Sequence, residues 1–381
     1  MHEKLFSQID ALLPSMLDLL EDICNLESQT CDKAGVDAVC DYCIKFAEKH
    51  GFKTELFPQS VSGNTALITM NPKATLPPIT LSAHMDTVHP RGSFGSPATR
   101  RDSDNMYAPG VMDCKGGIAA SFLAMLALLS YGFDKRPIQF YLQSDEENSS
   151  ATSNKETVKK MCEVAKGSVG FINLEGYVAP TAVLSRKGII RYRFTVHGRA
   201  IHSARCAYGA NAIAEAADKI LALEEMKDVG GLTCNCGVIS GGTAVNTVAE
   251  KCTFLADIRF VNSEQLKVAR EKVMEIAKKT RIEGCYTEVE EISFRPAMPL
   301  VERNVDFLRK INEIYEKCSL PRLVARDCVS GSDAAYITEC GVPCVDCLGT
   351  EGGNIHSTRE YARLTSLAES AKRIASVIYY I

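Results

Sequence analysis

Apolar segments of strand length alternate with helical segments through most of this chain, which restricts it to an α/β fold with a largely parallel sheet flanked by helices. The predicted strands are residues 65–70, 79–83, 138–143 and 170–174, and the predicted helices between them are residues 117–129 and 156–165. Polar motifs follow several of these strands directly. Because ligand sites in open α/β sheets lie beyond the carboxyl ends of the strands, we expect a functional site at that edge.

A second pattern begins near Ser185, where residues 188–196 alternate like a half-exposed antiparallel strand. A helix is predicted next, at residues 210–224, followed by two strands at 234–240 and 251–261. A second helix at 262–279 and a strand at 287–294 complete the pattern. This β-α-β-β-α-β order is typical of a ferredoxin-like α+β domain. The α/β pattern resumes after Pro296, with a helix at 304–316, a strand at 344–348 and a helix at 364–378. We therefore predict one domain of residues 1–184 and 297–381, into which a second domain, residues 185–296, is inserted.

The composition excludes several classes of partner. A chain of 381 residues, 46% of them hydrophobic, is longer than one core usually holds, which agrees with two domains. A net charge of −4 with scattered basic residues argues against a nucleic-acid or anionic-membrane surface and favours small soluble partners. Residues 1–27 have the pattern of an acidic amphipathic helix rather than of a secretion signal, and no run of about 18 apolar residues predicts a membrane span. We expect a cytoplasmic protein.

The sixteen cysteines are interpreted as reduced packing residues. The pairs Cys40/Cys43 and Cys234/Cys236 have spacings that also occur in metal and redox sites. Cys40 and Cys43, however, belong to a helical pattern over residues 36–50 and have no partner pair at zinc-finger spacing. A cysteine-based oxidoreductase, which would need a thiol of low pKa beside a cation, is kept as an alternative.

Histidines and carboxylates gather in the motifs at the strand ends. His84 and Asp86 have one residue between them, so both side chains point to the same side and the carboxylate can brace the imidazole. Asp113 lies between Gly110 and Gly116, in a turn where the backbone can approach a ligand closely. When each motif is taken alone, a structural histidine and a helix N-cap aspartate are the alternatives.

Glu146 and Glu147 are adjacent, just after the predicted strand 138–143. Neighbouring residues in an extended segment point apart, so one carboxylate can bind metal while the other accepts protons. Such a pair suits a mechanism in which a metal lowers the pKa of bound water to about 7 and a free carboxylate acts as the base. A solvated acidic loop is the alternative.

Together these motifs resemble those of the M20 family of metallopeptidases and aminoacylases, most nearly its glutamate-carboxypeptidase-like branch. The matching segments, in chain order, are residues 82–88 (SAHMDTV), 109–117 (PGVMDCKGG), 144–147 (SDEE), 331–336 (GSDAAY) and 356–357 (HS). The resemblance covers most of the chain, from about Ser82 to Tyr361. It implies a zinc-exopeptidase-like catalytic domain, with the inserted domain serving as a lid and dimerisation domain.

The resemblance also implies two metal ions that share one aspartate. The implied ligands are His84, Asp113 and Glu175 for one Zn²⁺ and Asp113, Glu147 and His356 for the other, with Co²⁺ or Mn²⁺ as substitutes. Glu146 would be the general base, and Asp86 would orient His84. The peptide bond between Asp113 and Cys114 would be cis.

The inserted domain would supply groups that face the substrate. By the same resemblance, His202 matches a histidine that reaches the other subunit's active site and helps to stabilise the tetrahedral oxyanion. Asn246 and Arg259 match polar groups that face the substrate, Arg295 matches a carboxylate clamp, and the backbone at Gly353 would add hydrogen-bond donors. A surface or strand-edge cation is the alternative for each arginine.

The implied activity is that of a dinuclear zinc hydrolase, active as a homodimer formed through the inserted domain. It would cleave a peptide or N-acyl amide bond of a small substrate that carries a free α-carboxylate. Deacylation of N-acyl amino acids, as by acetylornithine deacetylase or succinyl-diaminopimelate desuccinylase, is the alternative reaction, and a non-catalytic binding protein of the same fold is a further one. Thr181 stands where the glutamate-releasing branch has a lysine, and Arg186 or Lys187 could replace that charge.

Overall fold

The computed structural model describes residues 2–227 and 230–381. Its contacts divide them into two units. Unit 1 comprises the described residues up to Ser185, Leu300–Asp327 and Ser332–Ile381, and unit 2 comprises those of Arg186–Pro299 with the short segment Cys328–Gly331. The sequence pattern assigns that short segment to the α/β domain. Its contacts lie in unit 2 because the Arg186 guanidinium donates hydrogen bonds to Ser330 and Gly331.

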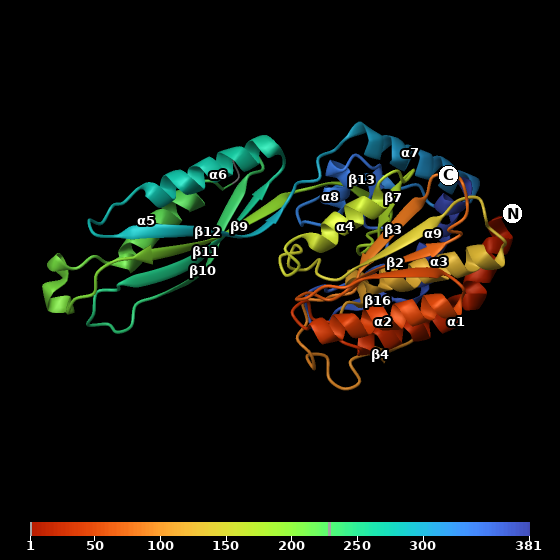
Figure 1. The fold of residues 1–381 in the computed structure, drawn as a ribbon, viewed down its shortest axis with the longest axis horizontal. Coiled ribbons are helices and arrows are strands. Elements are labelled where there is room, and N and C mark those ends of the chain that lie inside the picture. The colour runs from red at the N-terminus through yellow and green to blue at the C-terminus, as the bar shows by residue number, and fades with distance from the viewer. Residues whose placement is uncertain (1, 228–229) are drawn as a thin grey trace. The chain divides into compact units, whose positions relative to one another are not determined.

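A six-stranded sheet forms the centre of unit 1 (Figure 1). Its order is β1 (Lys53–Phe57), β2 (Thr65–Met70), β6 (Ile138–Gln143), β3 (Ile79–His84), β7 (Phe171–Asn173) and β14 (Cys344–Val345). The pairs β6–β3, β3–β7 and β7–β14 are parallel, whereas β1–β2 and β2–β6 are antiparallel. The prediction of an α/β fold is confirmed, and the sheet is mixed because the antiparallel hairpin β1–β2 forms one of its edges.

Helices cover both faces of this sheet. They are α1 (His2–Asn25), α2 (Lys33–Lys49), α3 (Gly116–Ser130), α4 (Glu156–Ala165), α7 (Glu302–Lys317), α8 (Ala334–Glu339) and α9 (Leu364–Tyr380). Figure 1 shows α4 on one side of the sheet and α1, α2 and α3 on the other. Every residue of β3 is buried, as expected for a strand that is covered on both faces. The strand end that carries His84 is therefore held by packing from both sides.

Helix α3 forms the middle of the unit 1 core. An 18-residue window within Val111–Ser130 has a mean hydropathy of 1.5, which by length and composition would allow this stretch to cross a membrane, so the expectation of no such run is wrong. That window is entirely buried, whereas Leu129 and Ser130 at the end of α3 are exposed, and α3 packs against α1, α9 and β3. An apolar helix that is buried on all sides is what the centre of a large core requires.

Two smaller sheets complete unit 1, and the sequence pattern predicts neither. One has the order β15 (Gly352–Gly353), β16 (Tyr361–Arg363), β5 (Asn105–Tyr107) and β4 (Arg100–Arg101), and the other pairs β8 (Thr181–Arg186) with β13 (Val324–Cys328). The first sheet joins the segment that follows His356 to the segment that precedes Gly110. It thereby connects two parts of the chain that carry predicted site residues.

Unit 2 has the predicted β-α-β-β-α-β order. Its elements are β9 (Gly188–His197), α5 (Ala212–Glu224), β10 (Thr233–Gly241), β11 (Lys251–Phe260), α6 (Ser263–Lys278) and β12 (Tyr286–Arg295), and the antiparallel sheet has the order β10-β11-β9-β12. Both helices lie on one face of the sheet (Figure 1). Asn211 and Asn262 cap them by accepting hydrogen bonds from first-turn N–H groups, and stacked Phe194 and Phe254 join β9 to β11 in the core.

The cysteines form no disulfide, and all sixteen lie among the described residues. Cys40 and Cys43 are fully buried on α2, where the pKa of Cys40 is raised to about 12 by burial. Buried thiols of raised pKa behave as small apolar groups. This environment agrees with the interpretation of these two residues as packing residues.

Candidate active site

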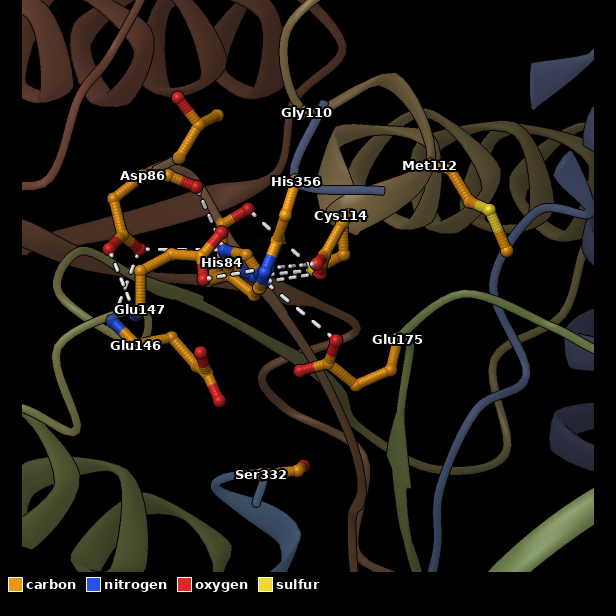
Figure 2. A network of polar contacts seen from close by, with 12 residues as sticks. His84, Asp86, Gly110, Met112, Cys114, Glu146, Glu147, Glu175, Ser332 and His356 are labelled. Carbon is orange, nitrogen blue, oxygen red and sulfur yellow. Dashed lines mark hydrogen bonds and ion pairs between the residues drawn. The ribbon is translucent and has the colours of Figure 1, made fainter. Parts of the chain in front are cut away.

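His84 ends β3, and its two ring nitrogens have different partners. The Nδ1 atom lies 2.9 Å from the main-chain oxygen of Asp86, which indicates that Nδ1 carries a proton and that Nε2 is the nitrogen turned toward the carboxylates. The Nε2 atom lies 3.1 Å from Oδ1 of Asp113 and 3.8 Å from Oε2 of Glu175 (Figure 2). The imidazole is almost completely buried. Its orientation is therefore fixed before any ligand binds.

Asp113 lies in the turn Val111–Lys115, at the start of α3. Gly110 enters this turn with a φ of +73°, and a Cβ atom there would come within 2.5 Å of Thr87, so the position requires glycine. The peptide bond from Asp113 to Cys114 is cis, as expected. The two carboxylate oxygens face different imidazoles, with Oδ1 3.1 Å from His84 and Oδ2 3.2 Å from His356.

Glu146 and Glu147 follow β6, and their side chains leave the loop in different directions (Figure 2). The Glu147 carboxylate reaches the cluster, where Oε2 lies 3.3 Å from Nε2 of His356. The main chain of this loop is held by Asp86, whose carboxylate accepts the N–H groups of Glu146 and Glu147 at 3.1 and 3.2 Å. The adjacent carboxylates thus have separate environments on one fixed loop.

The carboxylate of Asp86 does not make the simple contact with the His84 imidazole that the sequence predicts. Its carboxylate Oδ1 is 3.4 Å from Nδ1 of His84, farther than its own main-chain oxygen. The carboxylate accepts instead from the two loop N–H groups and, at 2.7 Å, from the hydroxyl of Thr30. Asp86 therefore ties the strand end of His84 to the loop of Glu146.

Glu175 follows β7 and is brought to the cluster by close packing. A Cβ atom on Gly117, in the first turn of α3, would lie 2.5 Å from the main-chain oxygen of Leu174. Only glycine at this position allows α3 to approach the segment that carries Glu175 so closely. The Glu175 side chain is about as buried as that of Asp113, with exposed fractions of 13% and 12%.

The electrostatics of the cluster follow from burial and close charge pairs. Burial raises the pKa of Glu147 to about 8. Hydrogen bonds to Asp113 and Glu147 raise the pKa of His356 to about 10. Burial opposes the charge of Asp113, but hydrogen bonds to both imidazoles outweigh it and hold the pKa of this carboxyl well below its usual range.

A divalent metal ion that binds this cluster should displace about one proton or more at pH 7, because a metal ion binds neutral imidazole and ionised carboxylate. The pKa values of His356 and Glu147, about 10 and about 8, both lie above pH 7, so the metal-free pair holds protons that the metal must displace. Zinc affinity should therefore rise as the pH is raised from 6 towards 8. Calorimetric titrations in two buffers of different ionisation enthalpy measure this release, and equal heats in both buffers would contradict the prediction.

The donor set fits divalent metal ions. Ligand atoms of His84, Asp113 and Glu147 lie within 4.8 Å of one another, and those of His84, Cys114 and Glu175 form a second such group. Imidazole and carboxylate are the donors that Zn²⁺ and similar ions take in hydrolases. Cys114 has no predicted role, and its Sγ atom accepts the main-chain N–H of His84 at 3.0 Å. Of the five predicted ligands, only His356 has a side chain that is about half exposed.

Two further residues that the sequence pattern does not indicate also support the site. Thr30 bonds Asp86, and Glu360 accepts main-chain N–H groups of the turn that carries Asp113. The only sequence signal for Glu360 is its position, four residues beyond His356.

His202 and Asn246 lie side by side in unit 2. The N–H of Ser203 donates to the main-chain oxygen of Asn246, and His202 forms an isolated β-bridge with Thr247. The Nδ1 atom of His202 accepts the N–H of Ala204 at 3.2 Å, which leaves Nε2 as the protonated nitrogen. The His202 and Asn246 side chains are both exposed on unit 2.

Arg259 and Arg295 have contrasting surroundings in unit 2. Arg259 is half-buried and donates to Asp257 at 2.6 Å, and Arg191 also donates to this carboxylate. Arg295, at the end of β12, is 4% exposed. A Cβ atom on Gly331 would approach its Cδ atom to 2.9 Å, so the glycine leaves room for this side chain. Neither arginine is a simple surface cation.

Arg186 and Lys187 could replace the lysine that the glutamate-releasing branch has at the position of Thr181. Both have hydrogen-bond partners within unit 2. Arg186 is 5% exposed and donates to the Ser330 hydroxyl at 2.9 Å, while Lys187 donates to the main-chain oxygen of Gly231 at 2.7 Å. Gly353 lies in unit 1, on β15, where it pairs with Tyr361.

Comparison with known proteins agrees with the family resemblance of the sequence motifs. Residues 184–285 match the peptidase dimerisation domain of the M20 family. Carboxypeptidase G2 of Pseudomonas sp. strain RS-16 is 25% identical over 377 residues, which cover 96% of this chain and 89% of that protein. The chain is an M20 peptidase homologue. Succinyl-diaminopimelate desuccinylase of Rickettsia canadensis is 27% identical to it over 201 residues, 49% of this chain and 51% of the relative.

The fold of this M20 homologue is also found in solved structures. An M20 family metallo-carboxypeptidase from Sulfolobus solfataricus superposes with a TM-score of 0.75 at 16% identity, covering 96% of this chain and 98% of the other. The M20 homologue therefore has the fold that the family resemblance implies, an α/β unit with an inserted α+β unit that matches the family's dimerisation domain.

Proposed function

We propose that this M20 homologue is a dinuclear zinc hydrolase that cleaves a peptide or N-acyl amide bond of a small substrate with a free α-carboxylate. The observation that carries the proposal is the position of Asp113, whose two oxygens face the imidazoles of His84 and His356. A carboxylate held between two imidazoles in this way suits a bridge between two metal ions. Glu175 and Glu147 lie at the outer ends of the cluster, one beside each imidazole.

The proposed ligands are His84, Asp113 and Glu175 for one metal ion and Asp113, Glu147 and His356 for the other. Bound zinc would supply Lewis-acid polarisation of the substrate carbonyl and a lower pKa for an attacking water molecule. Ligand atoms of His84, Asp113 and Glu147 lie within 4.8 Å of one another, a spacing that is compatible with metal binding.

Glu146 is the proposed general base. Its main chain is fixed by the bond to Asp86, and its side chain takes a different direction from the ligand Glu147 (Figure 2). It would accept a proton from the attacking water and return it to the leaving amine. The predicted division of labour between these adjacent carboxylates is thus supported by their geometry.

Unit 2 would bind the substrate and stabilise the oxyanion. His202 carries its proton on Nε2, the form that can donate a hydrogen bond to a developing negative charge. Arg295 is the proposed carboxylate clamp, with Asn246 and Arg259 as further contacts from unit 2. The backbone at Gly353, in unit 1, is the remaining proposed contact. The match to a dimerisation domain supports a homodimer formed through this unit, and the free cysteines support a reducing, cytoplasmic location.

Carboxypeptidase-type cleavage is the leading reaction because the relative that covers nearly the whole chain is a carboxypeptidase. Deacylation of an N-acyl amino acid is the second candidate, supported by the desuccinylase relative over half of the chain. Both reactions use the same metal cluster and a substrate carboxylate, so they differ only in the acyl side of the scissile bond.

A substrate screen tests the proposal. We expect zinc-dependent release of an amino acid from dipeptides or N-acyl amino acids, with acetylornithine and succinyl-diaminopimelate in the same panel. Conversion of the best substrate's carboxylate to the carboxamide should lower kcat/KM by about 10- to 150-fold, because a hydrogen bond to a charged group contributes about 1.5–3 kcal/mol. Hydrolysis that is unchanged by a chelator, in protein free of bound divalent metal, would refute the dinuclear assignment.

A further inference from the structure

Glu360 is a fully buried carboxylate just before β16, and it faces the turn that carries Asp113. Its Oε1 atom accepts the main-chain N–H groups of Met112 at 3.0 Å and Asp113 at 3.1 Å. Its Oε2 atom accepts the N–H of Gly110 at 3.3 Å. One side chain thus binds three N–H groups of a single turn.

His89 is the side-chain partner of Glu360. Its Nε2 atom lies 2.8 Å from Oε2 of Glu360, and the imidazole is 6% exposed. The ring also packs edge-on against Phe94, at 4.9 Å between centroids. The carboxylate is therefore held in place by a group outside the turn and cannot rotate away from the N–H groups without losing this bond.

We propose that Glu360 is a positioning residue that fixes the Asp113 carboxylate for metal binding, with His89 holding Glu360 in place. The inference rests on the proposed function and extends it to a residue that contacts no substrate or metal. Hydrogen bonds to an ionised acceptor are about twice as strong as neutral ones, so three of them on one turn strongly restrict its main chain. Asp113 has the non-helical angles φ −117° and ψ 85°, so helix hydrogen bonding alone does not hold it in this conformation.

The orientation of Asp113 matters more than that of any other ligand, because both of its oxygens are used. A rotation that favours the His84 side moves the other oxygen away from His356. Partners of this kind, which hold a ligand without touching the metal, typically contribute about 10- to 100-fold in metal affinity. Loss of Glu360 should therefore weaken both metal positions together.

The test is Glu360→Gln, which keeps the shape but places an NH₂ group against at least one main-chain N–H. We expect zinc affinity, measured by chelator competition at 25 °C, to fall by about 10- to 100-fold. The absorption spectrum of the Co²⁺-loaded protein should also change, because the spectrum reports ligand geometry. A purely structural role would lower the melting temperature without moving either readout.

Glu215→Gln is the matched control. Glu215 is 1% exposed on α5 and accepts the main-chain N–H groups of Arg281 and Ile282, but it lies in unit 2. This variant should lose stability while keeping the zinc affinity and the Co²⁺ spectrum of the wild type. Should Glu360→Gln fail to fold, His89→Gln keeps the Glu360 carboxylate but removes the imidazole that holds it, and it should give a smaller change of the same kind.

Unchanged zinc affinity and an unchanged Co²⁺ spectrum in the variant that folds would overturn the inference while leaving the proposed function intact. Absence of stoichiometric zinc binding in the wild type is a separate outcome. In that case the proposed function fails, and the role of Glu360 fails with it.

Discussion

Replacing Glu146 with glutamine should lower kcat by about 10²- to 10⁴-fold, the usual contribution of a general base, while the metal content stays that of the wild type. Glutamine has nearly the same shape but cannot accept the proton of the attacking water. The loop should keep its position, because its bond to Asp86 comes from the main chain of Glu146. Steady-state kinetics on the best substrate of the screen, with metal analysis of the same sample, measure both quantities.

The neighbouring position makes this prediction specific. Glu147→Gln should lose metal from the His356 side, since Glu147 is a proposed ligand that lies 3.3 Å from this imidazole. Glu163→Gln, on the exposed face of α4, is the surface control and should leave kcat unchanged. If Glu146→Gln retains near-normal kcat, or if it loses metal as Glu147→Gln does, the roles of the two carboxylates are wrongly assigned.

Asp113→Ala should have the largest effect on metal binding, with zinc affinity reduced at both positions and hydrolysis abolished. The reason is that one carboxylate faces two imidazoles, so its removal takes a donor from each proposed metal ion. The loss of zinc affinity should exceed the roughly 10- to 100-fold that follows substitution of a residue that hydrogen-bonds to a metal ligand. Metal content after dialysis against weak chelator, together with zinc competition titrations, provides the measurement.

A surface aspartate serves as the comparison for this variant. Asp134 is exposed in the loop before β6, and Asp134→Asn should bind zinc as the wild type does. Circular dichroism should show that Asp113→Ala remains folded, since the core around α3 does not include its side chain. A variant that still bound one zinc ion with full affinity would show that Asp113 serves a single metal and does not bridge.

Much of the fold is predictable because its main elements are long and have clear periods. The strands predicted at 65–70 and 138–143 coincide with β2 and β6, and the inserted domain has the predicted element order. The predicted strand 344–348 is shorter in the structure, where β14 is Cys344–Val345. The chain turns after it because Asp346 accepts hydrogen bonds from Asn173 and Cys347, and Cys347 has a φ of +65°.

The sheet of β15, β16, β5 and β4 could not be predicted, because strands of two or three residues have no recognisable period. β4 and β15 contain two residues each, and β5 and β16 contain three. Their pairing depends on tertiary contacts between distant segments. Packing, rather than local propensity, therefore decides this part of the fold.

The proposed ligands could be named from the sequence because each stands in a short motif, whereas the groups that hold them could not. Glu360 binds N–H groups that are 247 to 250 residues away in the chain. Asp86 uses its main-chain oxygen for His84 and its carboxylate for the Glu146 loop. A sequence motif identifies which side chain is a candidate ligand. Only the folded structure decides whether a residue such as Asp86 bonds a given partner through its main chain or through its side chain.

The burial of α3 has a consequence for the synthesis of the protein. This helix is apolar on all sides, and one of the helices that cover it, α9, follows the inserted unit in the chain. A nascent chain therefore carries an apolar helix that is only partly covered throughout the translation of unit 2, whose own core contains no residue of α3 or α9. Exposed apolar surface of this kind promotes aggregation, so a chain shortened before α9 should depend on chaperones even though its inserted unit is intact.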